Sequence, residues 1–141
     1  MTSYVVDASI VIQHVVPDTY TVNADELFAQ LGTTLTLHVP EFCLLECANV
    51  LWKQVRFHNL TQSEAEDLLD ALTGLPLTII QVMELLPRSL EIGLAHQLAV
   101  YDSLYIAMAE RLGLPLITAD TKQETAARTL GIAITPIADF K

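Results

Sequence analysis

The stretch of sequence that decides the fold runs Val100-Tyr-Asp-Ser-Leu-Tyr-Ile-Ala-Met-Ala-Glu-Arg-Leu-Gly-Leu-Pro-Leu-Ile-Thr-Ala-Asp120. Apolar residues recur at helical spacing after Asp102, which has the side chain of a helix N-cap, and a glycine and a proline then end the predicted helix. The run that follows is short and apolar, which is typical of a buried strand. The helix carries the chain roughly 16 Å in one direction, and the strand returns it by a similar distance. We therefore predict that Asp102 and Asp120 lie at the same end of the fold.

Strand-like and helix-like segments alternate through the rest of the chain. We predict strands over residues 3–6, 35–39, 77–82, 115–119 and 132–135, and helices over residues 9–16, 23–31, 41–57, 61–72, 84–99, 102–112 and 122–130. This alternation predicts an α/β fold, with a parallel sheet covered by helices on both faces, as one domain over residues 1–141. Ligands bind such sheets beyond the carboxyl ends of the strands, where the strand order reverses. Asp7 and Asp120 each follow a strand in that direction, so both should lie at this edge.

The charge and the cysteines restrict the classes of function. The 141 residues carry a formal net charge of −10, and no lysine or arginine occurs before Lys53. A protein that coats nucleic acid needs a basic surface, so this class is disfavoured, whereas a cation site or a basic partner fits an acidic chain. Cys43 and Cys47 stand four residues apart in a predicted helix, which favours a reducing cytoplasm over a disulfide framework. No apolar run approaches ~18 residues and the amino terminus lacks a basic region, so we expect neither a membrane span nor a signal peptide.

Four carboxylates are the candidate functional groups. Asp7, Asp102 and Asp120, taken singly, could each be an ordinary helix cap or turn residue. Glu46 lies in the middle of a predicted helix, opposite its apolar stripe, a placement that solvent exposure explains equally well. Several acids at one sheet edge would repel one another and resist ionising together. A hard divalent cation such as Mg²⁺ or Mn²⁺ removes this conflict and supports phosphodiester hydrolysis by activating a water.

Four segments together resemble a PIN domain, and more narrowly the toxin ribonuclease of VapBC toxin–antitoxin pairs. They are Val5-Val-Asp7-Ala-Ser9, the helix that contains Glu46, Tyr101-Asp102-Ser-Leu-Tyr-Ile-Ala-Met-Ala, and Leu116-Ile-Thr118-Ala-Asp120. The resemblance covers essentially the whole chain, with the acids in the same order and on matching elements. It implies a five-stranded parallel sheet of order 3-2-1-4-5 and cleavage of RNA that depends on Mg²⁺ or Mn²⁺.

The resemblance also implies roles for single residues. The family's acidic quartet, which binds the metal and carries catalysis, corresponds to Asp7, Glu46, Asp102 and Asp120. Ser9 and Thr118 match positions where a hydroxyl supports the site, although helix capping and strand propensity explain them equally well. The match departs after the fourth acid, where some relatives carry a further aspartate or asparagine and this chain continues Thr121-Lys-Gln-Glu124. A second metal position, and the role of Glu124, therefore stay open.

The expected partners are RNA, an antitoxin and a second copy of the chain. The candidate RNA contacts are Asn49, Lys53, Arg56 and Lys122, although ordinary solvated surface explains each one taken singly. Trp52 lies on the apolar stripe of the Glu46 helix and is expected in the core. An acidic toxin suits an antitoxin with a basic carboxy-terminal segment, and the resemblance implies a homodimer formed through helices.

Three alternatives use the same α/β pattern. A phospho-acceptor receiver domain needs an aspartate after the third strand, where this chain has Ile-Ile-Gln-Val-Met-Glu84. A phosphatase of the haloacid dehalogenase type needs Asp-x-Asp after the first strand, where this chain has Asp7-Ala-Ser9. The third alternative is a PIN-like domain that has lost activity and serves as an interaction module. The presence of all four acids favours the enzyme.

Overall fold

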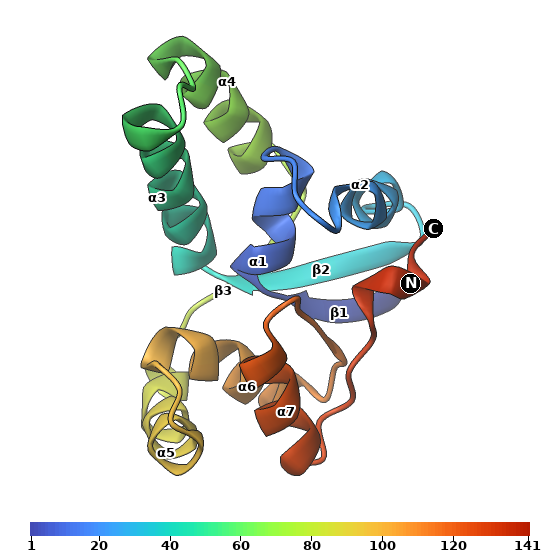
Figure 1. The fold of residues 1–141 in the computed structure, drawn as a ribbon. Coiled ribbons are helices and arrows are strands. Elements are labelled where there is room, and N and C mark those ends of the chain that lie inside the picture. Colours follow the sequence, from blue (N-terminus) through green and yellow to red (C-terminus); the bar gives the residue numbers. More distant parts are fainter.

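The computed structural model describes residues 1–141 and contains one parallel β-sheet (Figure 1). Its strands lie in the order β3-β2-β1-β4, with bounds β1 (Thr2–Val6), β2 (Leu35–Pro40), β3 (Thr78–Ile80) and β4 (Leu116–Ile117). β1 pairs with β2 from Thr2↔Leu35 onward, and with β4 through Val5↔Leu116 and Val6↔Ile117. The chain therefore runs outward from β1 to β3 and then returns to the other side of β1. The strand order reverses between β1 and β4, as the resemblance implied.

Helices cover both faces of this sheet. They are α1 (Ala8–Val11), α2 (Thr21–Ala29), α3 (Phe42–Phe57), α4 (Gln62–Thr73), α5 (Leu86–His96), α6 (Val100–Leu112) and α7 (Thr121–Thr129), with short 3-10 turns at Ile12–His14, Met83–Leu85 and Ile137–Asp139. Figure 1 shows α1 to α4 on one side of the sheet and α5 to α7 on the other. The predicted α/β class and the two helical layers are confirmed.

The predicted fifth strand over residues 132–135 is wrong. This segment makes only an isolated parallel bridge, Leu116↔Ile134, supported by two backbone hydrogen bonds of 2.9 and 3.0 Å. It lies beside β4, where the fifth strand was expected, but Pro136 follows it and has no N–H for a further ladder bond. The sheet has four strands, in the first four positions of the expected order.

The burial of α6 explains why the stretch quoted first decides the fold. Every residue of α6 from Ser103 to Ala109 is buried, as in a helix that is covered on all sides. α6 packs against α5, α7, β1 and β4, so it joins one helical layer to the centre of the sheet. Cys43 and Cys47 are buried as free thiols in the same core. None of the helices has both the length and the apolar character that a membrane span requires.

The expectation that Trp52 lies in the core is wrong. The residue is 55% exposed, and its ring contacts Phe57 edge-on at a centroid distance of 6.1 Å. The fully buried residues of α3 are Cys43, Cys47 and Leu51. α3 and α4 pack on each other and extend away from the sheet (Figure 1), and Leu45 and Trp52 of the apolar stripe are left exposed.

Candidate active site

The four acids lie around the point where the strand order reverses. Asp7 immediately follows β1, and Asp120 follows β4 after two residues. Asp102 lies in the first turn of α6, and Glu46 lies in the second turn of α3. Because the carboxyl ends of neighbouring parallel strands share one edge, these elements bring the acids to one side of the sheet.

Asp7 is the most enclosed of the four acids, with 3% of its surface exposed. It occupies the N-cap position of α1, but its carboxylate caps no backbone N–H there. Instead, Oδ1 accepts a hydrogen bond from the Ser9 hydroxyl (2.6 Å) and Oδ2 accepts one from the Thr118 hydroxyl (2.8 Å). The Ser9 hydroxyl accepts from Ala119 N–H (3.1 Å), and the Thr118 hydroxyl accepts from Asp120 N–H (3.0 Å). These bonds fix the orientation of the Asp7 carboxylate and tie it to the segment after β4.

The environment of Asp7 disfavours its charged form. Burial raises the pKa of the carboxyl from 3.8 to about 7, against the hydrogen bonds from Ser9 and Thr118, which lower it. The negative charges of Asp120 and Glu46 add to the rise. Nearby positive charge would favour the ionised form again. Shifts of this kind are typical of functional sites.

Asp102 and Asp120 are placed by the first turns of α6 and α7. The prediction that Asp102 is an N-cap is wrong, because Ala99 is the N-cap of α6 and Asp102 lies inside the first turn. Its Oδ1 accepts a hydrogen bond from Nε2 of Gln123 (3.3 Å). Asp120 is the N-cap of α7, where its Oδ1 accepts from the backbone N–H groups of Lys122 (2.9 Å) and Gln123 (3.3 Å). Burial raises the pKa of Asp102, the Gln123 bond lowers it, and the charge of Asp120 raises it.

Glu46 is held by a residue that the sequence reasoning missed. The Tyr105 hydroxyl donates to Oε1 of Glu46 at 2.8 Å. Burial raises the pKa of the Tyr105 phenol, so the phenol stays protonated and can donate. Burial also raises the pKa of Glu46, the Tyr105 bond lowers it, and the charge of Asp102 raises it. Tyr105 stands three residues after Asp102 and so lies on the same face of the helix. This spacing is the feature of the sequence from which its place near the acids could have been predicted.

The four carboxylates form a ring, in which each acid lies near two others and is repelled by their negative charges. Asp7 lies near Glu46 and Asp120, and Asp102 lies near the same two. The acids do not form a preformed metal site. No three histidine, cysteine, aspartate or glutamate side chains are close enough together to act as a set of metal ligands. Like charges keep apart unless a cation joins them, and Mg²⁺ usually takes one or two carboxylates and keeps several waters. A donor set made of oxygens alone fits a hard cation better than zinc, which favours nitrogen and sulfur ligands.

Comparison with known proteins shows the family of this chain. The sequence pattern of the PIN domain matches residues 4–129. The chain belongs to the PIN domain family. Ribonuclease VapC3 of Pyrobaculum aerophilum is 33% identical over 118 residues, which cover 82% of this chain and 88% of that protein.

Solved structures share the PIN fold over nearly the whole chain. The crystal structure of PAE2754 from Pyrobaculum aerophilum superposes with a TM-score of 0.76 at 20% identity, covering 98% of this chain and 92% of that one. A toxin–antitoxin complex from Klebsiella pneumoniae contains a chain with a TM-score of 0.55 at 19% identity, covering 85% of this chain and 88% of that one. At these identities the likeness concerns the fold.

The predicted RNA contacts of the PIN domain are exposed. Asn49, Lys53 and Arg56 lie on the turns of α3 that follow Glu46, and Lys122 lies in the first turn of α7. Lys122 also borders a pocket of about 250 Å³, whose other lining residues are His96, Thr121, Thr125 and Ala126. Glu124, whose role the sequence left open, is ion-paired with Arg128 at 3.0 Å.

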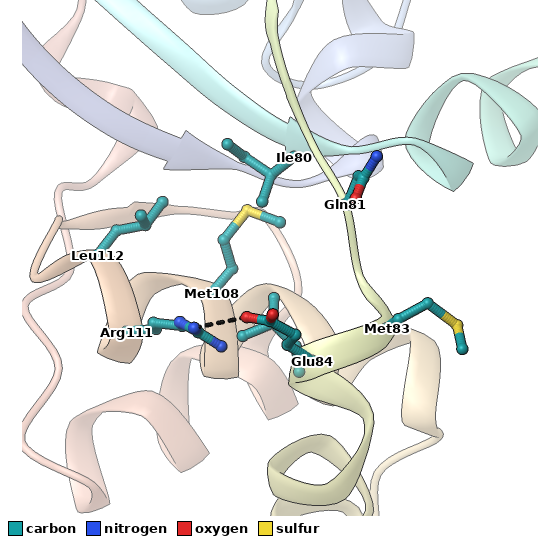
Figure 2. Close-up of a pocket in the computed structure, with 8 residues that line it drawn as sticks. Ile80, Gln81, Met83, Glu84, Met108, Arg111 and Leu112 are labelled. Atoms are coloured by element: carbon teal, nitrogen blue, oxygen red, sulfur yellow. Dashed lines mark hydrogen bonds and ion pairs between the residues drawn. The ribbon is translucent and has the colours of Figure 1, made fainter.

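A separate hollow of the PIN domain is mainly apolar (Figure 2). It has a volume of about 280 Å³ and lies between the segment after β3 and the second half of α6. Its lining residues are Ile80, Gln81, Met83, Glu84, Leu85, Met108, Arg111 and Leu112. Figure 2 shows the ion pair of Arg111 with Glu84, at 2.7 Å, between two of these elements. None of the four ring carboxylates lines this hollow, so it is not the acidic site.

Proposed function

We propose that this PIN domain is a metal-dependent endoribonuclease and the toxin of a toxin–antitoxin pair. The related VapC3 protein is named a ribonuclease, and the fold is shared with a chain of a toxin–antitoxin complex. The observation that carries the proposal is the ring of Asp7, Glu46, Asp102 and Asp120 around the reversal of strand order. Their mutual repulsion and their oxygen-only chemistry support a site for Mg²⁺ or Mn²⁺.

The side chains of the site would have two roles, binding the metal and orienting its ligands. A bound Mg²⁺ or Mn²⁺ would lower the pKa of a water and stabilise charge on a phosphoryl oxygen. Ser9 and Thr118 hold the Asp7 carboxylate with both oxygens fixed, and Tyr105 holds Glu46. Such supporting hydrogen bonds orient metal ligands and keep them from rotating away. The quartet would therefore hold the cation, while the surrounding hydroxyl groups keep the acids in place.

RNA cleavage with and without chelator tests this function. A mixed RNA substrate is incubated with the protein and Mg²⁺ or Mn²⁺, and the same reaction is run with excess chelator. We expect endonucleolytic fragments that disappear with the chelator and return when the metal is restored. Absence of cleavage from every RNA supplied would favour the alternative of an inactive interaction module. Cleavage that the chelator leaves unchanged would contradict the metal.

The basic residues support an RNA-binding face. Of the seven lysines and arginines, Arg88, Arg111 and Arg128 are engaged in ion pairs with glutamates. Lys53 and Arg56 make no ion pair with an acidic residue, and they extend along α3 beyond Glu46. Cations of this kind bind phosphates and release counterions, which makes binding depend on salt.

We expect Lys53→Ala combined with Arg56→Ala to weaken RNA binding across all sequences. The slope of log K against log salt should fall by about 1 for each phosphate contact that is lost. The measurement is a filter-binding titration at several salt concentrations, with Lys141→Ala, also outside the ion pairs, as the matched control. Equal slopes for the double variant and the control would remove these residues from the RNA interface.

The acidic surface supports the proposed protein partner. With a net charge of −10, the chain favours a partner segment of opposite charge, such as a basic carboxy-terminal segment of an antitoxin. Trp52, Phe57 and Leu45 add exposed apolar surface on α3, which suits a protein interface. We also propose that the chain forms a homodimer, as the resemblance implied.

A further inference from the structure

Gln123 is an unusual residue for the position that it occupies. It lies in the first turn of α7, only 1% exposed, among the largest fully buried side chains of the protein. Buried glutamine is uncommon unless its amide is hydrogen-bonded. The hydrogen bonds of the buried Gln123 amide therefore decide why a glutamine occupies this position.

Gln123 bridges two of the four acids. Its side-chain Nε2 donates to Oδ1 of Asp102 at 3.3 Å, and its backbone N–H donates to Oδ1 of Asp120 at 3.3 Å. One residue thus contacts the carboxylates at the two ends of the stretch that runs from α6 to α7. An ionised carboxylate accepts hydrogen bonds and cannot donate them, so the amide nitrogen is the end of Gln123 that faces Asp102.

The other end of the Gln123 amide has no partner in the protein. Its Oε1 is buried and accepts no hydrogen bond from any protein group. An unpaired buried carbonyl oxygen destabilises the folded protein. Gln13, the other buried glutamine, differs: its amide donates to Ser9 O (2.9 Å), and its oxygen accepts from Tyr20 N–H (2.7 Å). The fold supplies hydrogen-bond partners for both ends of the Gln13 amide, whereas it supplies one for only the nitrogen end of the Gln123 amide.

We propose that Gln123 is a positioning residue of the acidic site, whose side-chain amide holds the Asp102 carboxylate in place for a divalent cation. This inference rests on the proposed function. The unpaired Oε1 is buried, so the fold alone does not account for an amide at this position. A glutamate here would add a further negative charge, whereas glutamine orients the acids without adding one.

Gln123→Met tests the proposal, because methionine keeps the length of the side chain and removes the amide. We expect the melting temperature of the metal-free variant to equal or exceed that of the wild type, since an unpaired buried oxygen is removed. Mn²⁺ affinity, measured from free Mn²⁺ by electron paramagnetic resonance, should fall about 10- to 100-fold, as for other residues that orient metal ligands. Gln13→Met, which removes a fully bonded amide, should instead lower the melting temperature. Gln123→Leu provides a second variant if the methionine variant does not fold.

A double-mutant cycle separates positioning from structure. If Gln123 acts through Asp102, adding Gln123→Met to Asp102→Asn should change Mn²⁺ affinity little beyond the single Asp102 change. Wild-type Mn²⁺ affinity in Gln123→Met would overturn the inference and leave the proposed function intact. Failure of the wild type itself to bind Mn²⁺ would overturn the proposed function, and the role of Gln123 with it.

Discussion

Asp102→Asn should lower the rate of RNA cleavage by at least about 10²-fold, because even residues that only orient metal ligands change activity 10- to 100-fold. Asparagine has nearly the same size and shape as aspartate. Its Oδ1 can still accept the hydrogen bond from Gln123, so the fold around the first turn of α6 should persist. What the substitution removes is the negative charge. The measurement is the initial rate of cleavage at saturating Mg²⁺, together with the melting temperature.

The control for this prediction is Asp67→Asn, which changes the same type of residue at an exposed position of α4. This variant should cleave RNA at the wild-type rate. Cleavage by Asp102→Asn at the wild-type rate would remove Asp102 from the catalytic quartet. A lower rate accompanied by a large fall in melting temperature would show structural damage rather than loss of a catalytic charge.

Asp7→Asn should stabilise the metal-free protein at pH 8 while abolishing its activity. The pKa of Asp7 is raised from 3.8 to about 7 in the folded protein, so the folded state binds a proton there that the unfolded state has released. The stability that this proton provides is fully present below about pH 4 and is lost as the pH rises to 7 and above. The free energy of unfolding of the variant should therefore rise, relative to that of the wild type, by on the order of 2–4 kcal/mol, since each pKa unit corresponds to about 1.4 kcal/mol.

Urea unfolding between pH 4 and pH 8, with chelator present, measures this difference. The free energy of unfolding of Asp7→Asn should rise relative to the wild type as the pH increases through this window. Asparagine can keep bonds to the Ser9 and Thr118 hydroxyls, so the variant tests the charge and not the packing. A constant difference across the window would mean that burial does not raise the pKa of Asp7.

The sequence predicted the elements that position the site because their signals are local. Short apolar runs end directly before Asp7 and before the Thr118–Asp120 segment, so both could be placed at one sheet edge. The extent of α3 to Phe57 follows from the periodicity of its apolar residues. The resemblance then supplied the strand order, of which the structure contains the first four strands.

The features that could not be predicted depend on contacts between distant parts of the chain. The Tyr105–Glu46 bond joins residues 59 positions apart, and the Gln123–Asp102 bond joins residues 21 apart. Capping preference suggested Asp102 as an N-cap, but α6 begins earlier and leaves its carboxylate free for the site. Periodicity placed Trp52 on an apolar stripe, but it could not show that the residue is exposed in the folded protein.

The central claim is that the acids form a divalent-cation site, and metal-dependent melting tests it most directly. At pH 8, Mg²⁺ should raise the melting temperature of the wild type, because a ligand that binds the native state stabilises it by about 2.7 kcal/mol at 100 times its Kd. Asp120→Asn should shift much less, although asparagine is as good an N-cap as aspartate and keeps α7 intact. A much larger shift in the wild type than in Asp120→Asn is the predicted result. Equal shifts in the wild type and in Asp120→Asn would contradict it.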